Sequence, residues 1–83
     1  MRKIHIDIIA PGNGKSYEFM FDDTIKIGKL LELAIAQITE LESGNISFAS
    51  DAMLCDETQM APLSPELTAH EAGLRSGKKL FLV

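Results

Sequence analysis

The chain has one cysteine and no tryptophan among its 83 residues. The single thiol, Cys55, has no partner for an intramolecular disulfide, and small secreted domains of this length usually carry several disulfides. Long apolar runs are also missing. The first residues alternate polar and apolar side chains, whereas a signal peptide has a continuous apolar region. No segment reaches the roughly 18 apolar residues of a membrane span. We therefore expect a cytoplasmic protein with no direct membrane insertion, which could reach a membrane only through a partner.

Positive charge is scarce and scattered along the chain. Acidic residues outnumber basic residues by 12 to 8, which gives a formal charge of −4 at pH 7. Binding to a phosphate backbone needs a clustered positive stripe, and this sequence contains none. We therefore do not expect nucleic acid as a partner.

The length allows one domain and excludes two, because domains below about 50 residues rarely sustain a hydrophobic core. A single domain over residues 1–83 is therefore predicted. A chain of this size needs most of its apolar residues for the core, so little apolar surface is left for a deep pocket.

The first part of the chain predicts two strands joined by a tight hairpin. Apolar residues alternate with polar ones over residues 2–9 and again over residues 16–21, the period of a half-buried strand. The stretch between them contains Asn-Gly and two glycines, which is typical of a hairpin turn. The residues expected to face the core are Ile4, Ile6, Ile8, Tyr17, Phe19 and Phe21.

An amphipathic helix is predicted over residues 25–41, where apolar residues recur at spacings of three and four. Thr24 follows two aspartates and is the expected N-cap. Gly44 is expected to end the helix in the left-handed conformation. Leu33 and Ile35 flank the apolar stripe and widen it.

Shorter strands are predicted in the second half of the chain, at residues 46–49, 52–55 and 78–83. In the last of these, Leu80 and Leu82 are expected to point inward, and Phe81 and Val83 outward. Residues 56–72 contain two prolines and no clean periodicity, which predicts a loop with one helical turn near residues 65–70.

This order of elements is that of the β-grasp fold, and several segments resemble ubiquitin. They are the helix start at Thr24-Ile25, the segment Ile46-Ser47-Phe48-Ala49-Ser50, and the closing segment from Ala72-Gly73-Leu74 to Val83. The resemblance implies an α+β, ubiquitin-like β-grasp fold with a mixed four- to five-stranded sheet and one packed helix. The stretch that contains residues 58–65 is an insertion relative to ubiquitin.

The small size and acidic balance look most like the YukD-type proteins. These are ubiquitin-like components of the type VII (WXG100/ESX-like) secretion systems of Gram-positive bacteria. The resemblance implies a cytoplasmic accessory that docks on a membrane-bound component, such as the FtsK-like ATPase or another subunit.

Relatives that are conjugated to targets or carry sulfur act through a flexible C-terminal Gly-Gly. Here the sequence ends Leu82-Val83 within a predicted strand, and a β-branched residue there is neither thin nor flexible enough for that role. We therefore expect an interaction module that is not conjugated. The alternative is a ubiquitin-like modifier or sulfur carrier that acts with an activating enzyme, which would require a longer precursor.

Catalytic and metal-binding groups are few. Cys55 could act as a nucleophile with His5 or His70 as its base, but a single cysteine in a short strand is more often a small core residue. No pair among these three residues has the short ligand spacing of a zinc site. We expect no enzymatic activity, no cofactor and no metal.

The expected binding surface is the exposed face of the sheet, where ubiquitin-like domains contact many partners. By the resemblance, Ser47 takes the centre of that patch, with Phe81 and Val83 on the neighbouring strand. A hydroxyl at the centre implies that partners evolved for ubiquitin would not recognise this chain. Further candidates for contact with a partner or a second copy are Ile9, Met20, Leu33 and Ile35. Partial burial against a neighbouring element is the alternative for each of them.

Overall fold

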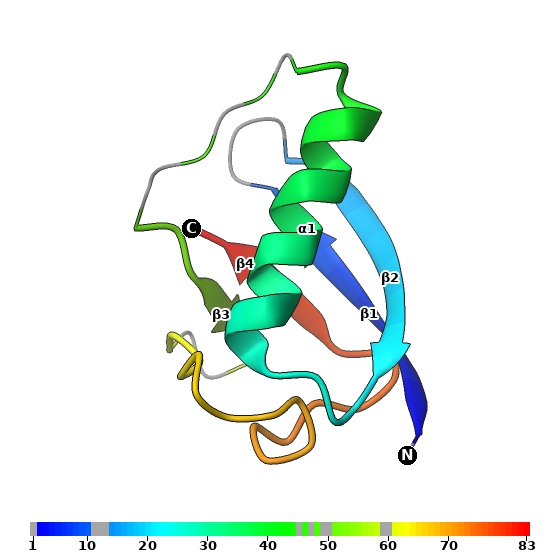
Figure 1. Ribbon diagram of the computed structural model, residues 1–83, viewed down its shortest axis with the longest axis vertical. Helices are drawn as coiled ribbons and strands as arrows, with labels where there is room; N and C mark the ends of the chain where they lie inside the picture. Colours follow the sequence, from blue (N-terminus) through cyan, green and yellow to red (C-terminus); the bar gives the residue numbers. More distant parts are fainter. Residues whose placement is uncertain (1, 11–13, 45, 47, 49–50, 59–60) are drawn as a thin grey trace.

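A computed structural model describes residues 2–10, 14–44, 46, 48, 51–58 and 61–83. The elements are β1 (Lys3–Ile9), β2 (Ser16–Asp22), α1 (Ile27–Leu41), β3 (Leu54–Asp56) and β4 (Lys79–Leu82). Within these residues the strands form one four-stranded sheet in the order β2-β1-β4-β3. β1 and β4 run parallel, and the other neighbours run antiparallel. Figure 1 shows α1 lying across the sheet, which confirms the predicted α+β arrangement.

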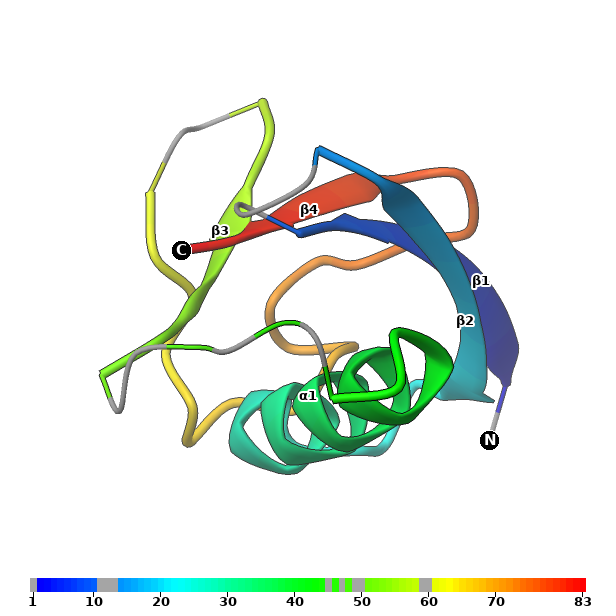
Figure 2. The same ribbon diagram turned by 90° about the horizontal axis from the view of Figure 1, so that it is seen from above.

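The core lies between α1 and one face of the sheet, as the view from above shows (Figure 2). Strand alternation places one side chain in two in this core, because successive residues of a strand point to opposite faces. The helix contributes the residues that recur at spacings of three and four. The buried apolar side chains of the core cluster are Ile4, Ile6, Ile8, Ile27, Leu30, Ala34, Ile38, Leu54, Ala69, Leu74, Leu80 and Leu82.

The connection between β1 and β2 is closed by two backbone hydrogen bonds. The Ala10 N–H donates to the Lys15 carbonyl (3.0 Å), and the Gly14 N–H donates to the Ala10 carbonyl (3.1 Å). Gly14 has φ of 68°, a conformation that glycine adopts without a Cβ clash. Residues 11–13 of the predicted hairpin lie outside the described residues.

The helix begins at Ile27, two residues later than predicted, and Thr24 is not its N-cap. The residue at the N-cap position is Lys26, whose side chain makes no capping hydrogen bond. Thr24 instead donates both its N–H (3.0 Å) and its hydroxyl (2.9 Å) to Oδ1 of Asp22. An aspartate that binds the backbone two residues on forms a turn of its own, so the Asp-Asp-Thr sequence makes the bend that leads into α1.

Backbone carbonyls from a distant loop satisfy the first helical N–H groups. The Ile27 N–H donates to the Leu67 carbonyl (2.8 Å), and the Gly28 N–H donates to the Pro65 carbonyl (3.1 Å). The free N–H groups of a first helical turn require such acceptors. The start of α1 is therefore capped by tertiary structure, which no local sequence motif reveals.

The helix ends as the sequence predicts. Gly44 has φ of 77°, and its N–H donates to the Thr39 carbonyl (2.9 Å). Ser43 also has a positive φ, of 54°. Two consecutive left-handed residues turn the chain sharply away from the helix axis.

The strand predicted at residues 46–49 falls largely outside the described residues, because Ser47 and Ala49 are not among them. Ile46 and Phe48 belong to none of the described strands and pack half-buried against the core. The next strand, β3, starts at Leu54 and not at residue 52 as predicted. No helix in the described part of the chain is both long and apolar enough to cross a bilayer.

Candidate protein-binding surface

The outer face of the sheet is the face that points away from α1, and an apolar row crosses it. The strand registers pair Ser16 with Ile9, Ile9 with Phe81, and Phe81 with Cys55, so these four residues lie side by side across all four strands. Ile9, Phe81 and Cys55 are half-buried. In Figure 2 the helix covers the opposite face only.

Two further apolar residues lie next to this row, two positions along the chain from Cys55 and Phe81. Val83 and Met53 exchange backbone hydrogen bonds of 2.9 Å and 2.8 Å, which places them beside each other. Val83 is 54% exposed and Met53 is 39% exposed. We call Ile9, Met53, Cys55, Phe81 and Val83 the apolar cluster.

A charged row separates the apolar cluster from the other end of the outer face. Glu18 pairs with Asp7, and Asp7 pairs with Lys79. Beyond this row Met20 pairs with His5 and is 56% exposed. Met20 therefore lies on the outer face, as predicted, but the charged row separates it from Ile9, Phe81 and Val83.

The two helix candidates lie on the other side of the molecule from the apolar cluster. Leu33 is 44% exposed, whereas Ile35 is half-buried and packs against the core. They are about 200° apart around the helix axis, since each residue advances about 100°. Ser47, the predicted centre of the patch, lies outside the described residues.

Cys55 faces the outer surface and is not the core residue predicted from the sequence. In β3 the flanking Leu54 and Asp56 are buried, so alternation points Cys55 outward, beside Phe81. Met53 was not predicted as a surface residue at all. If Leu54 points inward, strand alternation places both Met53 and Cys55 on the outer face. In a strand of three residues, however, the pattern is too short to show which residues point inward.

A groove of about 420 Å³ continues from Met53 around the β3 edge towards α1. It lies between the first turns of the helix, near Gly28 and Leu31, and the segment 62–65. Residues 62–65, which belong to the insertion expected from the resemblance, therefore form one wall of this groove. Pro62 forms an isolated β-bridge with Cys55. Sequence patterns alone did not reveal this groove.

A buried ion pair holds β3 to the start of β4. Asp56 is only 2% exposed, and its Oδ2 lies 3.0 Å from Nζ of Lys78. Its Oδ1 accepts the Thr58 N–H at 2.7 Å. A buried carboxylate needs such partners, so this acid has a structural explanation and its burial does not indicate a catalytic role.

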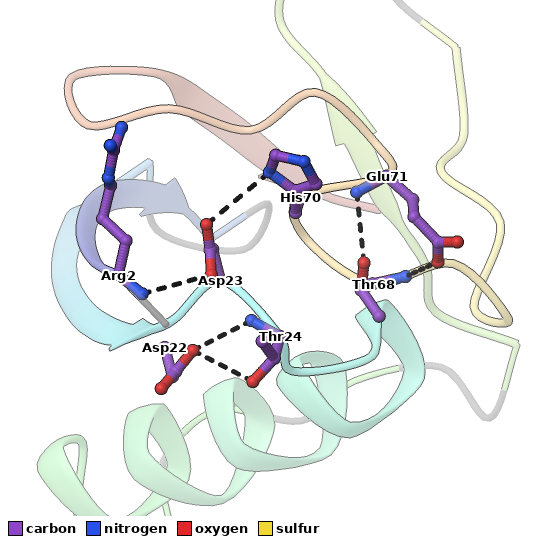
Figure 3. Close-up of polar contacts among 7 residues, drawn as sticks. All are labelled: Arg2, Asp22, Asp23, Thr24, Thr68, His70 and Glu71. Atoms are coloured by element: carbon purple, nitrogen blue, oxygen red, sulfur yellow. Dashed lines mark hydrogen bonds and ion pairs between the residues drawn. The ribbon is translucent and has the colours of Figure 1, made fainter.

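Three other carboxylates have pKa values lowered by hydrogen bonds that favour their charged form. The Thr24 N–H, and then the Thr24 hydroxyl, lower the pKa of Asp22. The Thr68 N–H and hydroxyl lower the pKa of Glu71 in the same order, while the Glu71 N–H returns a bond to the Thr68 hydroxyl (Figure 3). This reciprocal pair has the chemistry of a capping box.

Glu42 is the third such carboxylate and lies just beyond the end of α1. The Tyr17 hydroxyl, which donates to its Oε2 at 2.7 Å, is the main cause of its lowered pKa, followed by the charge of Lys15. This contact ties the start of β2 to the end of the helix. In the described part of the chain no three His, Cys, Asp or Glu side chains are grouped as metal ligands would be.

Comparison with known proteins finds no matching family model and no matching curated protein. Among solved structures, the EccD5 ubiquitin-like domain from Mycobacterium xenopi is 22% identical, with a TM-score of 0.73 and coverage of 100% of this chain and 94% of that one. The ubiquitin-like domain of the Mycobacterium tuberculosis type VII secretion system protein EccD1 is 15% identical, with a TM-score of 0.77 and coverage of 100% and 99%. Caldiarchaeum subterraneum ubiquitin is 16% identical, with a TM-score of 0.71 and coverage of 98% and 91%.

These similarities confirm the ubiquitin-like β-grasp fold that the sequence predicts. At such low identities they show the fold alone. A chain of a toluene 4-monooxygenase complex also matches, with a TM-score of 0.81 and 8% identity. The fold therefore does not by itself separate a binding module from a component of an enzyme.

Proposed function

We propose that this chain is a non-catalytic, ubiquitin-like protein-interaction module. In this proposal it serves as a YukD-type cytoplasmic accessory of a type VII (WXG100) secretion system. The observation that carries the proposal is the apolar cluster on the outer face of the sheet. The similarity in fold to the ubiquitin-like domains of EccD1 and EccD5 supports the link to secretion.

The apolar cluster has the organisation of a small protein-binding surface. Phe81 lies at its centre, between Ile9 on β1 and Cys55 on β3. Aromatic residues at the centre of a contact surface often contribute a large share of the binding free energy. The row of Glu18, Asp7 and Lys79 borders the cluster and provides the polar rim that surrounds most apolar contact surfaces.

The partner we propose is a protein subunit of the secretion machinery, either its FtsK-like ATPase or another membrane-bound component. Its contact segment should present apolar side chains to Phe81 and Val83 and opposite charges to the bordering row. Leu33 on the exposed flank of α1 is a candidate for a second contact, with Ile35, Met20 and Ser47 as further candidates. A second copy of the chain is another possible occupant of these surfaces.

The proposal includes that the module is not conjugated to targets. Residues Leu80 to Leu82 lie in β4, and the N–H and carbonyl of Val83 bind Met53. These residues are therefore part of the folded sheet. Mass spectrometry of the protein isolated from its cells would test this point, because a Gly-Gly end, a thiocarboxylate or a conjugate would favour the modifier or sulfur-carrier alternative.

Affinity capture tests the placement of the contact surface. The tagged full chain, its Phe81→Asp variant and its Leu33→Asp variant would be incubated with a detergent-solubilised membrane fraction of the producing cells. We expect the wild type to enrich a secretion-system subunit. We expect Phe81→Asp to reduce that enrichment at least about tenfold, as for a central contact residue.

The matched control is Leu67→Asp, which makes the same kind of change at an exposed residue of the loop below α1. It should leave capture unchanged, and circular dichroism should show that all variants fold. If Phe81→Asp and Leu33→Asp both leave every captured protein bound, the proposed surfaces are wrong. If Phe81→Asp keeps all captured proteins but light scattering shows that it no longer binds a second copy of the chain, the outer face is a homo-oligomer contact. The secretion partner must then bind another surface.

A further inference from the structure

The only two arginines of the chain, Arg2 and Arg75, line the same cleft although they lie at opposite ends of the sequence. The cleft has a volume of about 610 Å³ and also contains His70 and Ser76. Two buried apolar residues, Ile4 and Leu74, contribute to its lining. The lining thus combines two arginines and the Asp23 carboxylate with apolar residues.

Backbone hydrogen bonds hold together the segments that carry Arg2, Asp23 and His70. The Asp23 N–H donates to the Arg2 carbonyl (2.8 Å), and the His70 N–H donates to the Asp23 carbonyl (2.9 Å). The Arg2 N–H donates to Oδ1 of Asp23 at 3.4 Å. Figure 3 shows the Asp23 carboxylate between Arg2 and the ring of His70.

The remaining part of the cleft is the turn that carries Arg75. The Gly77 N–H donates to the His5 carbonyl (2.9 Å), and the His5 N–H donates to the Ser76 hydroxyl (3.1 Å). Both bonds fix the turn against β1. The backbone around the cleft is therefore organised before any ligand arrives, which lowers the entropic cost of binding.

Neither arginine guanidinium has an ion-pair partner within the part of the chain that the structure describes. The nearby Asp23 carboxylate is directed at Nδ1 of His70, 3.7 Å away. Guanidinium groups bind carboxylates through two parallel hydrogen bonds, and this geometry makes arginine well suited to anion recognition. The two arginines are thus free to bind an external anion.

We propose that this cleft binds a carboxylate of an acidic peptide segment. The arginines would bind the carboxylate, and the apolar lining would accept the aliphatic part of the segment. The net charge of −4 opposes a long polyanion such as nucleic acid more strongly than a short acidic segment. The cleft lies at the start of β1 and the apolar cluster at its end, about 20 Å away for a seven-residue strand, so this inference goes beyond the proposed function and does not depend on it.

Nuclear magnetic resonance titration of the isotope-labelled full chain tests this site. The probe is the acetylated and amidated peptide Glu-Glu-Leu-Glu-Glu, and its Gln counterpart is the uncharged comparison. We expect saturable shifts of amides near Arg2 and in residues 73–77 with the acidic peptide only. Arg75→Gln should weaken binding about tenfold, as for loss of a charge-assisted hydrogen bond.

Two more variants distinguish a defined site from general charge attraction. Lys79→Gln removes the same charge on the outer face and should change the dissociation constant less than about twofold. Asp23→Asn removes a negative charge from the cleft and should tighten binding. Absence of saturable shifts, equal weakening by Lys79→Gln and Arg75→Gln, or equal binding of the Gln peptide would overturn the proposal. Tighter binding of inorganic phosphate than of the acidic peptide at the same amides would also overturn it.

Discussion

Asp56 is a buried carboxylate in a strand of only three residues. Its charge is compensated by Lys78, whose side chain is 34% exposed, and by the Thr58 N–H. Removing one partner of a buried pair leaves the other charge without compensation, which costs more free energy than the pair contributes. The pair therefore holds the β3 edge of the sheet to β4.

Lys78→Met should lower the free energy of unfolding by about 2 to 3 kcal/mol, because the buried Asp56 carboxylate would lose its cation. Urea denaturation monitored by circular dichroism would measure the change. The matched control is Lys79→Met at the exposed neighbouring position, for which we expect less than about 0.5 kcal/mol. Equal effects of the two substitutions would show that the pair does not stabilise the fold.

At the scale of elements, the start of α1 depends on the loop that packs against it. Pro65 supplies a carbonyl to the Gly28 N–H and lies so close that a Cβ built at Gly28 would be 3.2 Å from the Cβ of Pro65. The side of the helix at this position has no room for a branched residue. The glycine in the first helical turn is thus explained by a tertiary contact, although glycine has a low helix propensity.

Gly28→Val should therefore destabilise the fold by about 2 kcal/mol, since the branched side chain would push Pro65 and its carbonyl away from the helix. Thermal unfolding followed by circular dichroism would measure the loss. Ala36→Val is the control, because Ala36 is exposed in the same helix. The control carries only the helix-propensity cost of valine, roughly 0.6 kcal/mol. If Gly28→Val loses no more stability than the control, the loop that contains Pro65 can move aside without a free-energy penalty.

At the scale of the whole molecule, carboxylates with lowered pKa values make hydrogen bonds near both ends of α1. Asp22 and Glu71 act near the start of the helix, and Glu42 acts at its end. Their usual pKa values are 3.8 for aspartate and 4.5 for glutamate. When the folded-state pKa is lower than the unfolded-state value, the unfolded chain binds protons first as the pH falls.

The free energy of unfolding should therefore decrease as the pH drops below about 4.5, whereas these three groups should contribute fully at pH 6 and above. Urea denaturation at a series of pH values would measure the slope. Glu42→Gln removes one of the three groups. It should make the decrease in the free energy of unfolding at acidic pH shallower without abolishing it. If the free energy of unfolding of Glu42→Gln falls with pH as steeply as that of the wild type, the hydrogen bond from Tyr17 does not persist in solution.

Most of the architecture can be predicted from the sequence, because the signals involved are local. Alternation located β1 and β2 together with their inward residues, and helical periodicity located α1. Gly44 marked the end of the helix, since a positive φ favours glycine. On the surface, alternation also placed Ile9, Phe81 and Val83 on the outer face.

Features that depend on residues far apart in the chain could not be predicted from local patterns. The cap of α1 comes from Pro65 and Leu67, so the local motif around Thr24 predicted the wrong first turn. The outward position of Cys55 follows from its pairing with Phe81 across β3 and β4. The meeting of Arg2 and Arg75 in one cleft is of the same kind. Periodicity in a sequence specifies which side of an element is apolar, but the packing of the whole chain determines which elements meet and which side chains they bring together.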